Sequence, residues 1–347
     1  MSTPVTQEQR MEILSSALDD KDLELIIFPT EQCNFRCTYC YEDFEQGRLS
    51  PAHVEAVKRL ITERCETGLR QLRISWFGGE PLVAYDIVTD ISSHARRLAN
   101  RHDVRLNVNL TTNGSMLTEA RFIELWECGA CEYQISLDGD EDAHNKTRLR
   151  KGGKGSFAEV YGALKTYDQM RNRGLLKGTT VMIRIHIHPA NMRSVLNLAH
   201  RISADLNPEN FSIYLKEVGY YGGKRDGDYA IYGHGDLTLD QLKLELRNLL
   251  PGFQNEEVAG QVSVCYAGRA NSFTIRADGS IGKCTLALNS DYNKVGKLNL
   301  DGTFALDGQK FGRWLQGLST MDVVDLGCPA HKVAQLAQSE AAAGVAA

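Results

Sequence analysis

The sequence predicts an α/β protein with a parallel, partly closed (β/α)6 barrel and a smaller unit behind it. Strand-like runs alternate with helix-like runs six times between residues 24 and 218. Such alternation is typical of parallel sheets whose helices cover the strands. Residues 263–332 then change character around a hairpin signal. With 347 residues and 42% hydrophobic content, the chain is long enough for one large domain and an appendage.

The strands of the barrel are predicted by six apolar or alternating runs. They span residues 24–28, 71–77, 104–110, 132–137, 180–187 and 211–217. In the third run apolar residues alternate with polar ones, at Val104, Leu106, Val108 and Leu110. This period of two is that of a half-buried strand.

Helices are expected between these strands, and two have recognisable starts. Ser50 is a natural N-cap with Pro51 at the first helical position. The apolar residues of this helix fall on one face, at Val54, Val57, Ile61 and Cys65. Ser156 is the expected N-cap of a second helix, with its apolar stripe at Phe157, Val160, Leu164 and Tyr167.

The chain divides by composition into five parts. They are an N-terminal segment (1–23), the barrel (24–218), a linker or lid with a helix near 240–250 (219–262), the C-terminal unit (263–332) and a tail (333–347). In the C-terminal unit, Ala277-Asp278-Gly279 predicts a hairpin turn between residues 272–276 and 280–284. The tail is rich in Ala and Gln and is expected to be frayed.

Polar motifs follow the carboxyl ends of the predicted strands. They are a cysteine loop after the first strand, then Phe77 to Pro81, Thr111 to Gly114, Ser136 to Gly139, and Glu217. In barrels of this kind, ligands gather at the carboxyl ends of the strands. We therefore expect these motifs to share one pocket.

The cysteine loop carries three thiols in C-x3-C-x2-C spacing, at Cys33, Cys37 and Cys40. This spacing indicates an iron-sulfur cluster in which one iron has no protein ligand and is open to a small molecule. The alternative is a zinc knuckle, but zinc sites usually pair C-x2-4-C or Cys/His couplets, and no couplet follows nearby. An iron that is open to a small molecule indicates a catalytic site.

The triplet, with the aromatic Tyr39 before its last cysteine, resembles that of the radical S-adenosylmethionine (SAM) superfamily. The resemblance covers most of the chain. It implies a SAM-binding 4Fe-4S cluster on the three cysteines, SAM as cofactor and a flavodoxin- or ferredoxin-type reductant. The cluster passes one electron to the sulfonium of SAM, and the resulting 5′-deoxyadenosyl radical removes a hydrogen atom from the substrate.

Further motifs resemble the SAM contacts of this superfamily. In Gly78-Gly79-Glu80 the glycines let the main chain approach a ligand, and the carboxylate accepts hydrogen bonds from an ammonium. The resemblance implies that this motif holds the amino group of SAM. Ser136 and Arg148 resemble the next contacts, with Arg148 pairing with the SAM carboxylate; the alternative is a solvated arginine in a charged loop. Asn113 is expected to support the ribose.

A second cysteine set lies in the C-terminal unit. Cys265, Gly279 and Cys284 form a C-x13-G-x4-C pattern that resembles the opening of SPASM and twitch extensions, which bind auxiliary clusters. Only Cys328 follows, so the resemblance implies one auxiliary iron-sulfur cluster on three cysteines. Its fourth ligand stays open among His331, Asp322, Asp325 and the substrate itself. The alternative for Cys265 and Cys284 is a structural role in the core.

The remaining cysteines are expected to be structural. Cys128 and Cys131 form a Cys-Gly-Ala-Cys at a helix-to-strand junction, for which a redox pair is the alternative. Cys65 lies on the apolar stripe of its helix.

The combination of motifs resembles maturases of ribosomally made (RiPP) peptides, which cross-link, epimerise or excise residues of a precursor peptide. Two alternatives are a sulfatase-type maturase, which has more cysteines, and a twitch-type small-molecule dehydrogenase. A third, from another class, is a non-catalytic iron-sulfur sensor, which needs no SAM site. Cleavage of SAM by the reconstituted protein separates an enzyme from a sensor.

Charge and composition narrow the range of possible partners and cellular locations. A net charge of -5 and a pI of about 6.0 give no basic field for a nucleic-acid backbone. No apolar run is long enough for a membrane span and no signal peptide precedes the first strand, so a cytoplasmic protein is expected. The segment before the first strand is too short for a leader-binding domain, so a separate leader-recognition protein is expected if a leader is bound.

Overall fold

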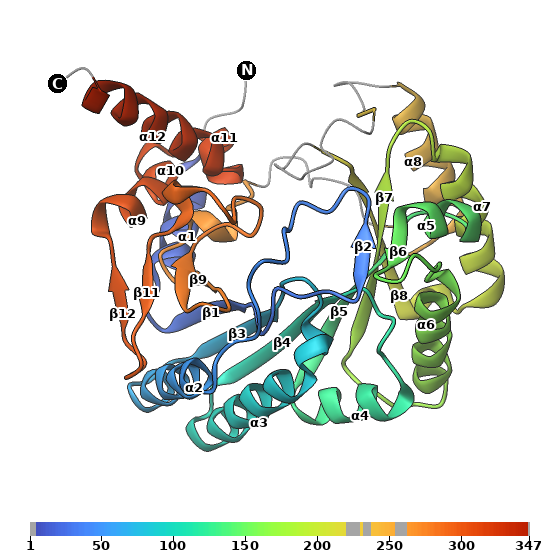
Figure 1. The fold of residues 1–347 in the computed structure, drawn as a ribbon, viewed down its shortest axis with the longest axis horizontal. Helices are drawn as coiled ribbons and strands as arrows, with labels where there is room; N and C mark the ends of the chain where they lie inside the picture. The colour runs from blue at the N-terminus through green and yellow to red at the C-terminus, as the bar shows by residue number, and fades with distance from the viewer. Residues whose placement is uncertain (1–4, 220–229, 232–236, 254–261, 346–347) are drawn as a thin grey trace.

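The computed structural model describes residues 5–219, 230–231, 237–253 and 262–345. Helices and a mostly parallel sheet form its α/β fold (Figure 1). The parallel strands lie in the spatial order β1-β3-β4-β5-β7-β8, which is also their order in the chain. They are β1 (Asp22–Ile27), β3 (Gln71–Trp76), β4 (Arg105–Thr112), β5 (Ala130–Leu137), β7 (Thr180–Ile187) and β8 (Phe211–Glu217). All six strands predicted between residues 24 and 218 are confirmed.

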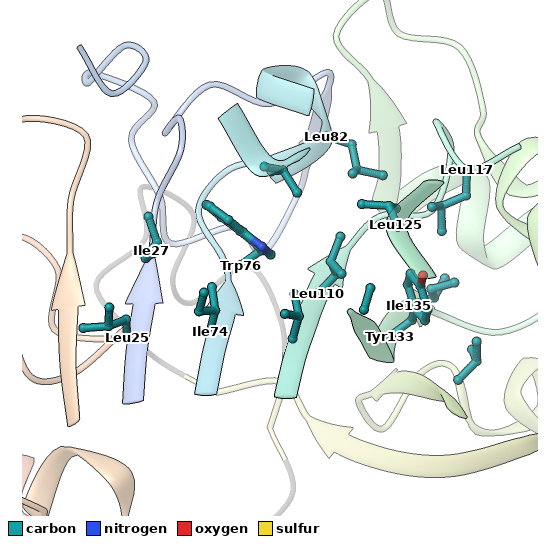
Figure 2. Close-up of a cluster of buried hydrophobic side chains, with 14 of the residues drawn as sticks. Leu25, Ile27, Ile74, Trp76, Leu82, Leu110, Leu117, Leu125, Tyr133 and Ile135 are labelled. Atoms are coloured by element: carbon teal, nitrogen blue, oxygen red, sulfur yellow. The ribbon is translucent and has the colours of Figure 1, made fainter. Parts of the chain in front are cut away.

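One face of these strands forms the core. Alternate residues of β3, namely Leu72, Ile74 and Trp76, are fully buried, and Figure 2 shows Ile74 and Trp76 beside Leu25 and Ile27 of β1. Helices pack against this sheet along one side (Figure 1). They are α2 (Pro51–Glu66), α3 (Tyr85–His102), α4 (Glu119–Glu127), α6 (Phe157–Asn172) and α7 (Met192–Asp205). The residues between the core positions point to the opposite face of the sheet.

The two predicted helix starts differ in their capping. The Ser50 hydroxyl accepts a hydrogen bond from the His53 amide at 3.2 Å, with Pro51 in the first turn, as predicted. Ser156 precedes α6 but makes no capping bond. Its hydroxyl instead donates to the Arg148 carbonyl at 2.6 Å, so Ser156 holds the predicted N-cap position but its side chain does not cap the helix. Both apolar stripes are buried as predicted.

The C-terminal unit continues the same sheet. Its first strand, β9 (Ser272–Ile275), pairs in parallel with β1. Antiparallel strands then extend the sheet: β10 (Ser280–Gly282), β11 (Gly296–Leu298) and β12 (Phe304–Leu306). The predicted turn between β9 and β10 is confirmed, with Gly279 at a φ of 80° that favours glycine. The hairpin therefore joins the β1 edge of the parallel strands directly.

Both ends of the described chain are helical and pack on the C-terminal unit. Ile13 and Ala17 of α1 (Gln7–Leu18) share a buried cluster with Leu318 and Leu326, which belong to α10 (Gln316–Thr320) and α11 (Val323–Gly327). The frayed tail predicted for 333–347 is wrong for its described part, because α12 spans Ala330–Val345 and buries Val333 completely. Short α9 (Gly308–Trp314) precedes α10.

Most of the predicted linker lies outside the described residues. Inside it, α8 (Leu237–Leu249) confirms the helix predicted near residues 240–250. Among the helices of the described segments, none combines the length and apolar character that a bilayer crossing requires. The division of the chain into five parts stays a prediction.

Candidate active site

The three cysteines of the triplet lie in the loop between β1 and α2, which a short sheet holds in place. In this sheet β2 (Phe35–Cys37) pairs antiparallel with β6 (Arg148–Arg150), so Cys37 faces Arg148 in register. Phe35 is buried, and Cys33 and Cys37 pack against the core. The Thr38 amide donates to the Thr147 carbonyl at 2.9 Å. The pairing therefore brings together two motifs that are far apart in the sequence.

Gly78 and Gly79 lie against the main chain of this loop. A Cβ on Gly78 would be 2.4 Å from the Thr30 carbonyl oxygen, and one on Gly79 would be 2.6 Å from that of Gln32. Gly78 also has a φ of 109°. The close approach that these glycines permit in the structure is thus to the cysteine loop, whereas the sequence suggests only an approach to a ligand.

Glu80 is fully buried, and its carboxylate already has protein donors. One oxygen accepts from the Leu82 amide at 3.0 Å and the Thr112 hydroxyl at 2.7 Å, and the other accepts from the Asn113 amide at 2.7 Å. Burial raises the pKa of the carboxyl, which these donors oppose. Glu80 therefore fixes the end of β4 next to the cysteine loop.

Asn113 also contacts the cysteine loop. Its side-chain amide donates to the Asn34 oxygen at 2.7 Å, and its own oxygen accepts from the Ser115 hydroxyl at 2.7 Å. Ser136 lies on β5, in register with Arg184 of β7, and is buried. The structure thus places Asn113, Ser136 and the glycine motif at the same end of the sheet as the thiols.

A buried polar network joins the triplet to β5 and β7. Arg148 donates to the Tyr39 hydroxyl at 2.7 Å, and that hydroxyl donates to an oxygen of Asp138 at 2.9 Å. The same oxygen lies 3.2 Å from Nδ1 of His186, and Thr147 donates to the other at 2.7 Å. Arg148 is therefore no solvated loop residue; only 6% of it is exposed.

In this network Asp138 is held in its charged form and His186 in its neutral form. Although burial raises the pKa of Asp138, the hydrogen bond from His186 and the charge of Arg148 hold it below its usual range. Burial lowers the pKa of His186 to about 4, so the ring is neutral at neutral pH. Asp138 and His186 were not singled out from the sequence. Asp138 lies in the Ser-Leu-Asp-Gly motif, and His186 alternates with the buried residues of β7, which is the signal that finds it.

The triplet fits a bound cluster. Burial, reinforced by the charge of Glu80, raises the pKa of the Cys33 thiol to about 12, and burial also raises those of Cys37 and Cys40. Three thiolates in such a place need the positive charge of a metal centre. Among the described residues, no three Cys, His, Asp or Glu side chains converge on a single ion. Cluster ligands need no such convergence, because each binds a different iron.

The fit to SAM rests on Arg148. Its Nε is buried without a hydrogen-bond partner among the described residues, although another guanidinium nitrogen donates to Tyr39. A guanidinium with an unused donor next to Cys37 suits a carboxylate ligand beside a cluster.

The second cysteine set is drawn together by local contacts. The Cys265 amide donates to the Leu326 carbonyl at 2.8 Å, which brings it to α11, whose C-cap is Cys328. The Tyr266 hydroxyl contacts the Thr285 hydroxyl at 2.7 Å. Because Tyr266 follows Cys265 and Thr285 follows Cys284 in the sequence, this contact holds the two cysteine segments together. Burial and the neighbouring charges of Cys284 and Cys328 raise the pKa of Cys265. Cys65, Cys128 and Cys131 are free thiols outside both sets.

The sequence profile of the radical SAM superfamily matches residues 27–202, which is about half of the chain. With its triplet and its parallel α/β fold, the chain belongs to the radical SAM superfamily. Its members are enzymes with a 4Fe-4S cluster and SAM, and they need a reductant.

Two curated relatives are GTP 3',8-cyclases. That of Paracoccus denitrificans (strain Pd 1222) is 39% identical over 117 residues, 33% of this chain and 32% of that protein. That of Rhizobium leguminosarum bv. trifolii (strain WSM2304) is 32% identical over 184 residues, 51% of this chain and 48% of that protein. The chain thus spans at most about half the length of these relatives.

Solved structures are similar over more of the chain. Native anSMEcpe with bound AdoMet and Kp18Cys peptide has a TM-score of 0.65 and 18% identity, covering 86% of this chain and 82% of that one. Streptococcus suis SuiB bound to precursor peptide SuiA has a TM-score of 0.58 and 16% identity, covering 90% of this chain and 70% of that one. At these identities the similarity is one of fold.

Proposed function

We propose that the chain cleaves SAM to a 5′-deoxyadenosyl radical, which abstracts hydrogen from a ribosomally made precursor peptide and so modifies it. The observation that carries this proposal is the extent of the fold similarity. Two proteins whose structures include peptides resemble 86–90% of this chain. The strands in chain order support a partial (β/α)6 barrel, and the cysteine-bearing hairpin supports a SPASM/twitch-like unit behind it.

In this proposal Cys33, Cys37 and Cys40 hold the SAM-binding cluster. A reduced cluster there supplies the electron that breaks a carbon-sulfur bond of SAM. Arg148 and Ser136 bind the SAM carboxylate, Asn113 supports the ribose, and Tyr39 holds Arg148 in place. The Gly78-Gly79 main chain and the Glu80 carboxylate bind the amino group of SAM. Protein donors fill three of about four acceptor positions of that carboxylate, which leaves one for SAM.

Cys265, Cys284 and Cys328 hold one auxiliary cluster in this proposal. Asp322 uses one oxygen to cap α11, accepting from Val324 and Asp325 amides, which favours His331, Asp325 or the substrate as fourth ligand. Replacing the three cysteines by Ala is expected to halve the bound iron and to stop product formation while SAM is still cleaved. Iron and sulfide analysis checks this, and unchanged iron would make the three thiols structural.

A second candidate function is cyclisation of a nucleotide, because the curated relatives are named GTP 3',8-cyclase. Their similarity covers a third to a half of the chain, whereas the fold similarity to the peptide-bound structures covers most of it. The peptide substrate is therefore preferred.

Mass spectrometry separates the two substrates. A peptide encoded next to the gene is co-expressed with the enzyme and, as control, with its Cys33→Ala variant. A mass change that depends on active enzyme supports the peptide proposal. Consumption of GTP by the reconstituted enzyme, with the peptide unmodified, supports the second function instead.

A further inference from the structure

The face of the sheet opposite the core is polar. On β7 the residues between the buried positions are Met182, Arg184 and His186, and on β8 they are Ser212, Tyr214 and Lys216. All six are partly exposed, whereas their neighbours along the strands are buried. In a β/α barrel, residues that alternate in this way with the buried positions face the interior.

Arg184 lies on this polar face and has no partner among the described residues. Its Nε is buried and unbonded, and no other described residue forms a hydrogen bond or ion pair with its guanidinium. The other arginines with a buried, unbonded Nε differ, because each donates through another nitrogen: Arg148 to Tyr39, Arg171 to Leu176 and Arg269 to Val264. A buried donor without an acceptor costs free energy, so the unbonded Nε of Arg184 indicates a ligand.

The register places Arg184 beside the active site. Its neighbours across the sheet are Ser136 on β5 and Tyr214 on β8. Two residues further along β7, His186 contacts Tyr39 of the cysteine loop. The charge of Arg184 also acts on Tyr41, which follows the last cysteine of the triplet. A group bound by Arg184 would thus lie next to the SAM site.

Two acidic side chains of the site, Asp138 and Glu80, are already engaged. Asp138 is bonded to Tyr39, His186 and Thr147, and Glu80 has three donors of its own. Neither carboxylate forms an ion pair with the guanidinium of Arg184.

We infer that Arg184 binds an anionic oxygen group of the substrate, a carboxylate or a phosphate, and orients the substrate beside SAM. The planar guanidinium suits both groups, because each presents two oxygens to its parallel N–H donors. The inference rests on the proposed radical SAM function. For a peptide substrate it predicts an Asp or Glu side chain, or the terminal carboxylate, close to the reacting residue.

The test uses the anaerobically reconstituted protein with calorimetric binding of four probes. They are N-acetylglutamate amide, its neutral counterpart N-acetylglutamine amide, GTP and SAM. Arg184→Gln and Arg184→Met are compared with wild type and with Arg173→Gln, a control at an exposed arginine that pairs with Glu119. Melting temperatures report folding, and Arg184→Met is expected to melt no lower than wild type, because it removes a buried donor that has no acceptor among the described residues.

We expect both Arg184 variants to lose about tenfold in affinity for N-acetylglutamate amide, with SAM binding unchanged and the neutral probe unaffected. Loss for GTP alone would support the anion site while removing the peptide from the proposed function. Equal affinities of wild type and variants for both anions would overturn the inference. So would a loss confined to SAM, since the anion would then be the SAM carboxylate.

Discussion

At the scale of single residues, Glu80 acts on its surroundings through hydrogen bonds inside the protein. Its carboxylate holds Thr112 and Asn113 at the end of β4 and accepts from the Leu82 amide at the start of the next 3-10 turn. The same residue follows two glycines that touch the cysteine loop. A change at Glu80 therefore affects both the loop and the predicted SAM site.

Replacing Glu80 by Ala is expected to weaken SAM binding about tenfold or more while the cluster is retained. It is also expected to lower the free energy of unfolding by about 1–3 kcal/mol for each buried donor left without an acceptor. Calorimetry and urea unfolding of the reconstituted protein measure the two effects. Glu159→Gln, at an exposed ion pair with Arg150, is the control. Unchanged SAM affinity with lowered stability would restrict Glu80 to a structural role.

His144 predicts a pH dependence. Burial lowers its pKa from 6.5 to about 3, and its Nε2 lies 3.0 Å from the Ser156 hydroxyl. The unfolded chain therefore takes up a proton below pH 6.5 that the folded protein refuses until about pH 3. The stabilisation is complete above pH 6.5 and is lost as the pH falls, by up to about 1.4 kcal/mol per pH unit.

Urea unfolding between pH 7 and pH 4 is the measurement. His144→Phe is expected to flatten this pH slope by about one proton. His200→Gln, at an exposed position on α7, is the control. The same slope in wild type and His144→Phe would contradict the assignment.

At the scale of secondary-structure elements, the cysteine loop and the C-terminal hairpin are joined by a buried ion pair. Nε of Arg276, just after β9, donates to Glu31 at 2.9 Å, and its Nη2 lies 2.5 Å from the other Glu31 oxygen. Their side chains are 10% and 3% exposed. Arg276 also donates to the Leu288 carbonyl at 2.8 Å. The hairpin thus contributes directly to the position of the loop.

Arg276→Met is expected to cost about 3–5 kcal/mol of unfolding free energy, because it leaves the carboxylate of Glu31 buried and unpaired. Adding Glu31→Gln to this variant is expected to restore part of that loss. Urea unfolding of wild type, both single variants and the double variant gives the coupling energy. A coupling near zero would mean that the pair does not stabilise the loop.

The elements also show where sequence reasoning succeeds and where it stops. The barrel strands follow from local periodicity, and the hairpin follows from its turn residues. The pairing of β9 with β1 joins distant segments and has no local signal. The Ala-rich tail was expected to fray, but alanine favours helix, and burial of Val333 anchors α12. Arg184 escaped notice because the direction of a strand side chain depends on register.

At the scale of the whole molecule, the six parallel strands β1 to β8 and the C-terminal unit share one sheet and one core. Ile275 and Trp314 of the C-terminal unit belong to the same buried cluster as Trp76 of β3. The N-terminal helix α1 adds a second contact with that unit. The described chain should therefore unfold as one cooperative body, although the sequence divides it by composition.

Tryptophan fluorescence tests this cooperativity. Trp126→Phe/Trp314→Phe leaves only Trp76 of the three tryptophans, and Trp76→Phe/Trp126→Phe leaves only Trp314; both reporters are fully buried. Each is expected to report the same denaturant midpoint once corrected for the stability of its own variant. Separate midpoints for the two reporters would show that the units unfold independently.

The central claim is that Cys33, Cys37 and Cys40 form a SAM-cleaving centre, and formation of 5′-deoxyadenosine measures it most directly. Anaerobically reconstituted and reduced wild type is expected to convert SAM to 5′-deoxyadenosine. The variant with all three cysteines replaced by Ala is expected to produce none, while keeping about half of the iron on the second set. SAM cleavage by that variant at the wild-type rate would contradict the account.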